Sequence, residues 1–353
     1  MRNLILSISL SFITWHANAW VTCTMNNGAY QYFSPSTTSV GKDTEAGDLI
    51  GQWQTSTDSS TYTCSVPAAS VGETVSIGVR GYSPYAVWGS TTVDGQTYNI
   101  YHSAVKLGLG YIARWRYIVD GEASDWNPLV VAAGVYQAPS SLMTANTESP
   151  DSSWSIATEV QIHLVKTSND LTAGVVAAFD PVYLQLYQEY NGAYTAALIR
   201  LVQSSLGNFI IDTTGGTCTT PDVNVDLGNI FKSEFTGVGS TSAYTDFSLS
   251  FSGCPSGLSS ISYIFTPTTE IVDNNLGLFA MDSSSSSTGV AFQLLNNSAT
   301  PISFDATYIL SDYDSSLSDA SYTINMGARL YQTSSTVTSG TVSGAVTFTL
   351  IYK

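Results

Sequence analysis

The sequence VSGAVTFTLIY occupies residues 342–352 and alternates between apolar side chains and small or polar ones. Alternation with a period of two predicts a β-strand that buries one face and exposes the other. The buried face of this strand would carry Val342, Gly344, Val346, Phe348, Leu350 and Tyr352.

Similar β-rich runs, bounded by turn residues, lie at 248–252, 261–266 and 290–295. Two further segments, 182–190 and 195–203, fit either a short helix or a strand, and the pattern does not separate these possibilities. Asp94-Gly95 and Asn191-Gly192 are typical turn pairs. Short strands with regular turns predict an all-β fold made of sandwiches.

The 353 residues contain 11 Lys and Arg against 27 Asp and Glu, a formal net charge of -16. Nucleic-acid binding needs a basic face, so this balance argues against a nucleic-acid partner, and equally against an anionic membrane surface. Only 11% of the residues are charged. The length favours two domains.

Residues 1–19 have the features of a signal peptide. Arg2 supplies the positive start, an apolar run covers 4–15, and Ala17-Asn18-Ala19 fits a cleavage site, so the mature chain would begin at Trp20. The alternative is a retained anchor, but the apolar run is too short to span a bilayer. We therefore expect an exported protein.

Export makes disulfides possible among the four cysteines, Cys23, Cys64, Cys218 and Cys254. Three pairings are possible. The spacing favours Cys23–Cys64 and Cys218–Cys254, one bridge in each domain, each contributing about 4 kcal/mol of stability.

The best domain boundary is the polar run at 212–217, which gives domains at 20–211 and 218–353. All the tryptophans lie before this boundary. The first domain is therefore the better candidate for contacts with a partner, and the second for a scaffold.

The second domain resembles the pilin domain of chaperone–usher pili. The resemblance rests on an ordered set of motifs: Gly215-Gly216-Thr217-Cys218, Val223-Asn224-Val225-Asp226-Leu227-Gly228, Phe247 to Cys254, Gly289 to Leu294, Gly327 to Thr333, and the final strand.

This resemblance implies an incomplete immunoglobulin-like sandwich that lacks its last strand. A donor strand, first from a periplasmic chaperone and then from the next pilin subunit, would fill the groove by β-augmentation, with assembly at the outer-membrane usher. The groove edge would comprise Val342, Val346, Phe348, Leu350 and Tyr352. The alternative is a complete, autonomous immunoglobulin-like module.

A domain of about 190 residues stands where an ordinary pilin carries its donor extension. Such a subunit would receive a strand without supplying one. The arrangement is similar to the two-domain tip adhesins of type 1 pili, which implies a lectin-like N-terminal sandwich, a position at the pilus tip on the cell surface, and a host glycan or glycoprotein as receptor.

Sugar recognition uses aromatic faces together with polar and charged groups. The residue types in the first domain predict a ligand-binding set of Trp20, Arg80, Tyr82, Trp88, Arg114, Arg116, Asp125 and Trp126. Positive charge at Arg80, Lys106, Arg114 and Arg116 would favour an anionic ligand.

A structural role is the alternative for several of these positions. Alternation places Trp115 on one face of its strand and its neighbours Arg114 and Arg116 on the other, so Trp115 fits a core position. Arg114 and Arg116 would then share the outer face, or one of them would pair with Asp120 or Glu122.

The sequence contains no GxSxG or HExxH motif, and His102 and His163 alone do not make a zinc site. We therefore expect no catalysis, no cofactor and no metal. Two alternatives stay open: a structural tip initiator without a ligand, and a secreted glycan hydrolase using Asp120, Glu122 or Asp125.

Overall fold

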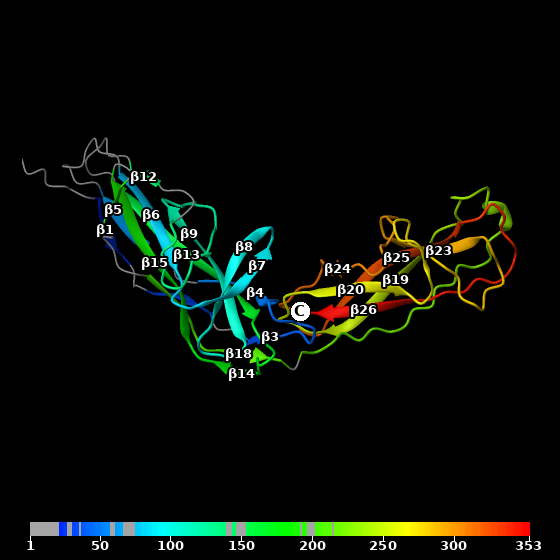
Figure 1. Ribbon diagram of the computed structural model, residues 1–353, viewed down its shortest axis with the longest axis horizontal. Coiled ribbons are helices and arrows are strands. Elements are labelled where there is room, and N and C mark those ends of the chain that lie inside the picture. Colours follow the sequence, from blue (N-terminus) through cyan, green and yellow to red (C-terminus); the bar gives the residue numbers. More distant parts are fainter. Residues whose placement is uncertain are drawn as a thin grey trace, which may run out of the picture.

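In a computed structural model the chain forms two β-rich parts joined end to end, with the C-terminus at the junction between them (Figure 1). The structure describes residues 21–26, 30–34, 37–56, 61–65, 75–138, 143–145, 153–190, 193–195, 202–213 and 215–353. The expected signal peptide and Trp20 lie outside these residues. Among the described residues, no helix has the length and apolar character of a membrane span.

The largest sheet of the N-terminal part has the order β1-β5-β13-β9-β8-β7, with β4 on β13 and with β10 and β11 on β9. Its strands are β1 (Thr22–Met25), β4 (Leu49–Thr55), β5 (Thr61–Ser65), β7 (Val87–Val93), β8 (Gln96–His102), β9 (Leu109–Val119), β10 (Glu122–Ala123), β11 (Asn127–Pro128) and β13 (Ser153–Lys166).

A second sheet has the order β12-β6-β15-β17-β2, with β16 on β15, and a small third sheet has the order β14-β18-β3. Their strands are β2 (Tyr30–Phe33), β3 (Thr37–Ser39), β6 (Val75–Tyr82), β12 (Met143–Ala145), β14 (Gly174–Val176), β15 (Phe179–Tyr190), β16 (Ala193–Thr195), β17 (Val202–Leu206) and β18 (Phe209–Asp212).

One continuous core lies between these sheets, because their strands bury alternate side chains. On β9, Tyr111, Ala113 and Trp115 point into this core, and on β15 Leu184 and Leu186 do the same. The interpretation of Trp115 as a core residue is confirmed, since its side chain is fully buried.

The ambiguous segment 182–190 is strand, as part of β15. The turn predicted at Asp94-Gly95 joins β7 to β8, and both residues have positive φ, as a tight hairpin turn requires. Part of the second ambiguous segment, and Asn191-Gly192, lie outside the described residues.

The C-terminal part contains a five-stranded sheet, β19-β25-β23-β22-β21, and a three-stranded sheet, β24-β20-β26. Their strands are β19 (Thr245–Cys254), β20 (Ile261–Pro267), β21 (Ile271–Asp273), β22 (Leu278–Phe279), β23 (Val290–Asn296), β24 (Tyr308–Ile309), β25 (Ala320–Gln332) and β26 (Val346–Tyr352). A short 3-10 helix, η2 (Lys232–Glu234), precedes them. The all-β prediction is confirmed.

The last strand is shorter than the alternation predicts, because its first residues pair elsewhere. The backbone of Ser343 accepts a hydrogen bond from the Asp282 N–H (2.8 Å), and the backbone of Thr341 accepts one from Ser286 (3.0 Å). The strand therefore begins at Val346, and Val342 is not part of it.

Both predicted disulfides are present. Cys23 bonds to Cys64 across the pair β1–β5, and Cys218 bonds to Cys254 at the end of β19. In the second part the apolar core is divided into separate clusters, in which partly buried residues such as Phe247, Leu249 and Phe348 are as common as buried ones.

Candidate functional site

Two regions have the properties of binding sites: the outer face of β9 in the N-terminal part, and the outer edge of β26 in the C-terminal part. On β9, Arg114 and Arg116 flank the buried Trp115 and so point away from the core, as the alternation predicts. They pair in register with Gln161 and Glu159 of β13.

Two tryptophans and these two arginines stack into one row, which we call the arginine–tryptophan ladder. The Arg114 guanidinium lies 4.2 Å from the Trp53 ring centroid and 5.0 Å from that of Trp126. Arg116 lies 4.5 Å from the same Trp126 ring. Trp126 therefore contacts both guanidinium groups, and cation–π attraction holds the row together.

Each guanidinium has one nitrogen bound to the neighbouring strand. Arg114 Nε donates to Gln161 Oε1 and Arg116 Nε to Glu159 Oε2, both at 2.7 Å. The Arg116–Glu159 ion pair is partly exposed. Neither arginine pairs with Asp120 or Glu122; Asp120 Oδ1 instead accepts the Ser155 N–H (2.8 Å). The ladder therefore carries two positive charges, and Glu159 beside it carries one negative charge.

The end of the ladder at Trp53 rests on a buried, uncharged support. The Trp53 ring lies 5.2 Å from the His163 ring and 5.7 Å from that of Tyr98. His163 Nε2 lies 2.9 Å from the Gly51 carbonyl oxygen. Burial lowers the pKa of His163 to about 4, so this imidazole is neutral near pH 7.

The structure places Arg80 and Tyr82 on a different sheet from Arg114 and Arg116. On β6, Arg80 donates to Gln185 Oε1 (2.7 and 3.0 Å) and its guanidinium lies 4.2 Å from the ring centroid of Tyr136. Tyr82 stacks on Tyr183 (5.1 Å between centroids). The predicted ligand-binding residues therefore form two clusters.

The remaining predicted residues in the described part of the chain, Trp88 and Asp125, are exposed and belong to neither cluster. Trp88 is 40% exposed on β7, and Asp125 is exposed beside Trp126. Sequence reasoning missed Trp53, Tyr136 and Tyr183, which complete the two clusters. No local pattern marked them, although each lies on an outward position of a strand or in a loop. The described residues contain no group of three or more side chains suited to a metal ion.

In the C-terminal part, β26 pairs with a strand on one side only. It lies at the edge of its sheet, beside β20. Of its inward-facing residues, Val346, Phe348 and Leu350 are only partly buried, while Tyr352 is buried. An unpaired strand edge next to incompletely covered apolar side chains is a site for another strand.

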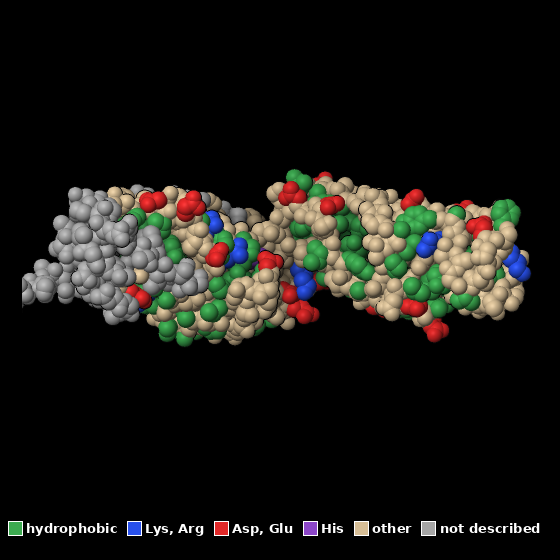
Figure 2. Space-filling model, turned by 90° about the horizontal axis from the view of Figure 1, so that it is seen from above, with side chains coloured by type: hydrophobic (Ala, Val, Ile, Leu, Met, Phe, Trp, Pro, Cys, Tyr) green, Lys and Arg blue, Asp and Glu red, His purple; other side chains and the backbone are tan. Residues whose placement is uncertain are grey.

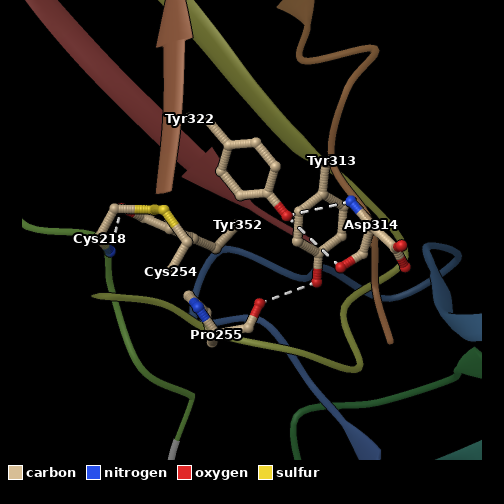
Figure 3. Close-up of a disulfide and its surroundings, with 7 residues drawn as sticks. All are labelled: Cys218, Cys254, Pro255, Tyr313, Asp314, Tyr322 and Tyr352. Atoms are coloured by element: carbon tan, nitrogen blue, oxygen red, sulfur yellow. Dashed lines mark hydrogen bonds between the residues drawn. A yellow bond between two sulfur atoms is a disulfide. The ribbon is translucent and has the colours of Figure 1, made fainter. Parts of the chain in front are cut away.

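The segment from Cys218 to Ile230 contacts residues near both ends of the chain region that holds β26. At one end, the Cys218 N–H donates to the Tyr352 hydroxyl (2.9 Å), next to the disulfide shown in Figure 3. At the other end, Leu227 and Ile230 pack on the cluster that Val342 also contacts. Between these ends, the described residues form no ladder with β26, and we call this unpaired side of β26 the open seam.

Tyr352 also connects the strand to its surroundings. Burial raises the pKa of its phenol, which stays protonated near neutral pH. Nearby, the Tyr313 hydroxyl donates to the Pro255 carbonyl (3.0 Å) and the Tyr322 hydroxyl accepts the Asp314 N–H (3.1 Å) (Figure 3). The end of the seam next to the disulfide is therefore fixed by several tyrosines.

Charged side chains are sparse over the visible surface of both parts (Figure 2). The fold and these sites together define a class: a two-part β protein whose second part is a sandwich with one open edge. Residues 205–353 match the model of the fimbrial protein family, so the similarity to fimbrial proteins lies in this second part.

The comparisons agree with this class. Over 135 residues the chain is 28% identical to the fimbrial subunit type 1 of Salmonella typhimurium, covering 37% of this chain and 71% of that protein. The CupB6 tip adhesin from Pseudomonas aeruginosa aligns over 94% of both chains, with 17% identity and a TM-score of 0.37.

A second similar structure is the CsuE subunit of Acinetobacter baumannii Csu pili, in a complex with the chaperone CsuC. It covers 94% of this chain and 100% of that chain, with 11% identity and a TM-score of 0.28. Both TM-scores are below 0.5, so the similarity to these two structures is distant. The resemblance to chaperone–usher pilus subunits, predicted from the motifs, is confirmed.

Proposed function

We propose that this protein is the tip adhesin of a chaperone–usher pilus. Its C-terminal domain receives a donor strand along β26, and its N-terminal domain binds a receptor on the host surface. The observation that carries the proposal is the unpaired outer edge of β26 beside partly buried Val346, Phe348 and Leu350.

A donor strand would complete the C-terminal sandwich in two ways. Its backbone would pair with the open edge, and its alternate side chains would cover the partly buried apolar residues. Burying apolar area contributes about 25 cal/mol per Å², so filling the seam would stabilise the domain. The donors we propose are a periplasmic chaperone during export and the next pilin subunit in the fibre, with assembly at the outer-membrane usher.

Donor-strand binding is testable with a synthetic peptide. We expect a peptide with apolar residues at alternate positions to raise the unfolding temperature of the mature chain in proportion to its concentration, because a ligand of the folded state stabilises it. The control is a peptide of the same composition in which the apolar residues are contiguous. Equal effects of the two peptides, or none from either, would contradict this part of the proposal.

For the receptor we propose an anionic host glycan or glycoprotein, bound without catalysis at the arginine–tryptophan ladder. The support is chemical: the ladder presents two guanidinium groups and two indole rings on one partly exposed face. Guanidinium groups bind carboxylates strongly, and indole faces stack on sugars. A weak single site would gain avidity from many pili acting together.

Binding of the full chain to an array of acidic and neutral glycans tests this receptor. Arg116→Gln should reduce binding of acidic glycans at least tenfold, and Glu159→Gln should increase it, because it removes the negative charge paired with Arg116. Arg80→Gln is the control, since it removes an arginine of the other sheet, where Arg80 donates to the Gln185 amide oxygen. Equal losses for Arg80→Gln and Arg116→Gln would exclude the ladder as the site.

The second candidate is a structural tip initiator without a ligand. It is favoured by the internal partners of both ladder arginines, Gln161 and Glu159, which are those expected of a purely structural row. Binding to no glycan or host protein, together with normal binding of the donor peptide, would support it.

A further inference from the structure

Among the described residues of the N-terminal part, the turn at Lys42 and Asp43 is the one whose hydrogen bonds reach the backbone of β26 on its open edge. The Asp43 N–H donates to the Tyr352 carbonyl oxygen (3.2 Å), and the Tyr352 N–H donates to Asp43 Oδ2 (3.1 Å). Asp43 thus satisfies both backbone groups of Tyr352.

These two groups belong to the outer edge of the strand. On the inner edge, Lys353 and Ser260 exchange two hydrogen bonds (3.0 and 3.1 Å), and the Ala345 carbonyl accepts one from Thr268 (3.0 Å). Residues of an antiparallel strand alternate between facing the partner and facing away. The peptide groups of Val346, Phe348, Leu350 and Tyr352 therefore point outward.

The turn at Lys42 and Asp43 is shaped for this close approach. A Cβ on Gly41 would lie only 2.1 Å from the Tyr352 carbonyl oxygen, so glycine is required there. Lys42 Nζ lies 5.2 Å from the Tyr352 ring centroid. The contact continues with an ion pair between Lys353 Nζ and Asp48 Oδ2 (3.1 Å).

A strand entering this seam has a register problem that side-chain alternation cannot solve. Sliding it by two residues returns the same set of side chains to the core, because the period of a strand is two. Several registers would then bury apolar residues equally well. A fixed barrier at one end of the edge would remove this degeneracy.

We propose that Asp43 is such an end stop. It occupies the pairing position at Tyr352 and leaves the incoming strand the peptide groups of Val346, Phe348 and Leu350. The partner is an extended segment of another polypeptide with apolar residues at alternate positions, and its terminal paired residue lies opposite Leu350. This inference rests on the proposed donor-strand function and adds the register in which the strand binds.

Amide hydrogen exchange of the mature full-length chain, followed by NMR, tests the end stop. In the free protein, the Tyr352 amide should exchange at least tenfold more slowly than those of Val346, Phe348 and Leu350. Addition of the alternating peptide should slow exchange at these three amides and leave Tyr352 nearly unchanged. In Asp43→Ala the protection of Tyr352 should fall about tenfold, whereas Asp43→Asn, which keeps an acceptor oxygen, should retain most of it.

Peptide length gives an independent measurement. In the wild-type chain, a two-residue extension at the peptide end that lies at Tyr352 should not improve affinity, whereas an extension at the other end should improve it. A threefold or greater gain from the first extension would overturn the end stop.

The outcomes separate the two proposals. If no peptide protects Val346, Phe348 and Leu350, the donor-strand function itself is wrong. If the peptide protects them but Tyr352 exchanges as fast as they do in the free protein, only the end stop is wrong.

Discussion

Trp115 and Gly81 touch across the core of the N-terminal part: a Cβ on Gly81 would lie 2.6 Å from Trp115 Nε1. Both residues face inward, one from β9 and the other from β6. Their chain neighbours therefore face outward in opposite directions. This contact places the arginine–tryptophan ladder and the Arg80–Tyr82 cluster on opposite faces of the sandwich.

The first prediction concerns this contact. Gly81→Ala should destabilise the N-terminal part by about 1–3 kcal/mol, because the added methyl group overpacks the core against a fully buried indole. Urea unfolding followed by tryptophan fluorescence measures it, since all the tryptophans lie before residue 212. Gly89→Ala on β7 is the control, because nothing lies within 4 Å of its Cβ position. Equal midpoints for the two variants would refute the overpacking.

The second prediction concerns pH. The pKa of His163 is about 4 in the folded state, against an ordinary value of 6.5. Between these values the unfolded chain binds a proton that the folded chain excludes, so stability should fall as the pH drops from 6.5 toward 4. The total loss should be about 3 kcal/mol.

Unfolding midpoints at pH 7 and pH 4.5 provide the measurement. His163→Gln should weaken the pH dependence in this range, whereas the exposed His102, changed to Gln, should leave it intact. A pH dependence that is the same in His163→Gln as in the wild type would assign the effect to other groups.

Local features of the sequence were sufficient for much of the fold. Alternation identified the last strand and the inward position of Trp115, and cysteine spacing favoured the two bridges that the structure contains. The predicted start of the last strand was wrong, because Thr341 and Ser343 bond to the loop at 282–287, and alternation does not reveal such long-range contacts.

The binding clusters show the same limit. Alternation correctly put Arg114 and Arg116 on one face, but it could not show that Trp53, about sixty residues earlier, would stack on Arg114. The residue types and charges also grouped Arg80 with these arginines, although strand pairing separates them. Which strands become neighbours depends on contacts between distant residues, and these are not encoded in a local period.

The third prediction concerns the Arg116–Glu159 pair. A double-mutant cycle with Arg116→Gln and Glu159→Gln should give a coupling energy below about 1 kcal/mol, because the pair is partly exposed. The coupling should decrease as salt rises from 0.05 to about 0.5 M, since salt screens exposed charges. Denaturant unfolding measures it. A coupling energy that does not change with salt would contradict this electrostatic explanation. It would indicate that the stacking of Arg116 on Trp126 determines the coupling.

The last prediction concerns Tyr352 and the second disulfide. Tyr352→Phe removes the hydroxyl that accepts the Cys218 N–H at 2.9 Å, and should cost about 1 kcal/mol locally. Local opening around Cys218 should then become about fivefold more frequent. Reduction of Cys218–Cys254 by a small thiol, followed by alkylation and mass spectrometry, should be correspondingly faster.

Cys23–Cys64 in the same molecule serves as an internal control, and its reduction rate should not change. Tyr322→Phe is the matched variant, because its hydroxyl accepts the Asp314 N–H in an exposed loop and not an N–H next to the bridge. If Tyr352→Phe and Tyr322→Phe accelerate reduction equally, the effect comes from general loosening of the domain. If only Tyr352→Phe does so, its hydroxyl fixes the Cys218 end of the open seam, and donor strands would bind to an edge whose end is already ordered.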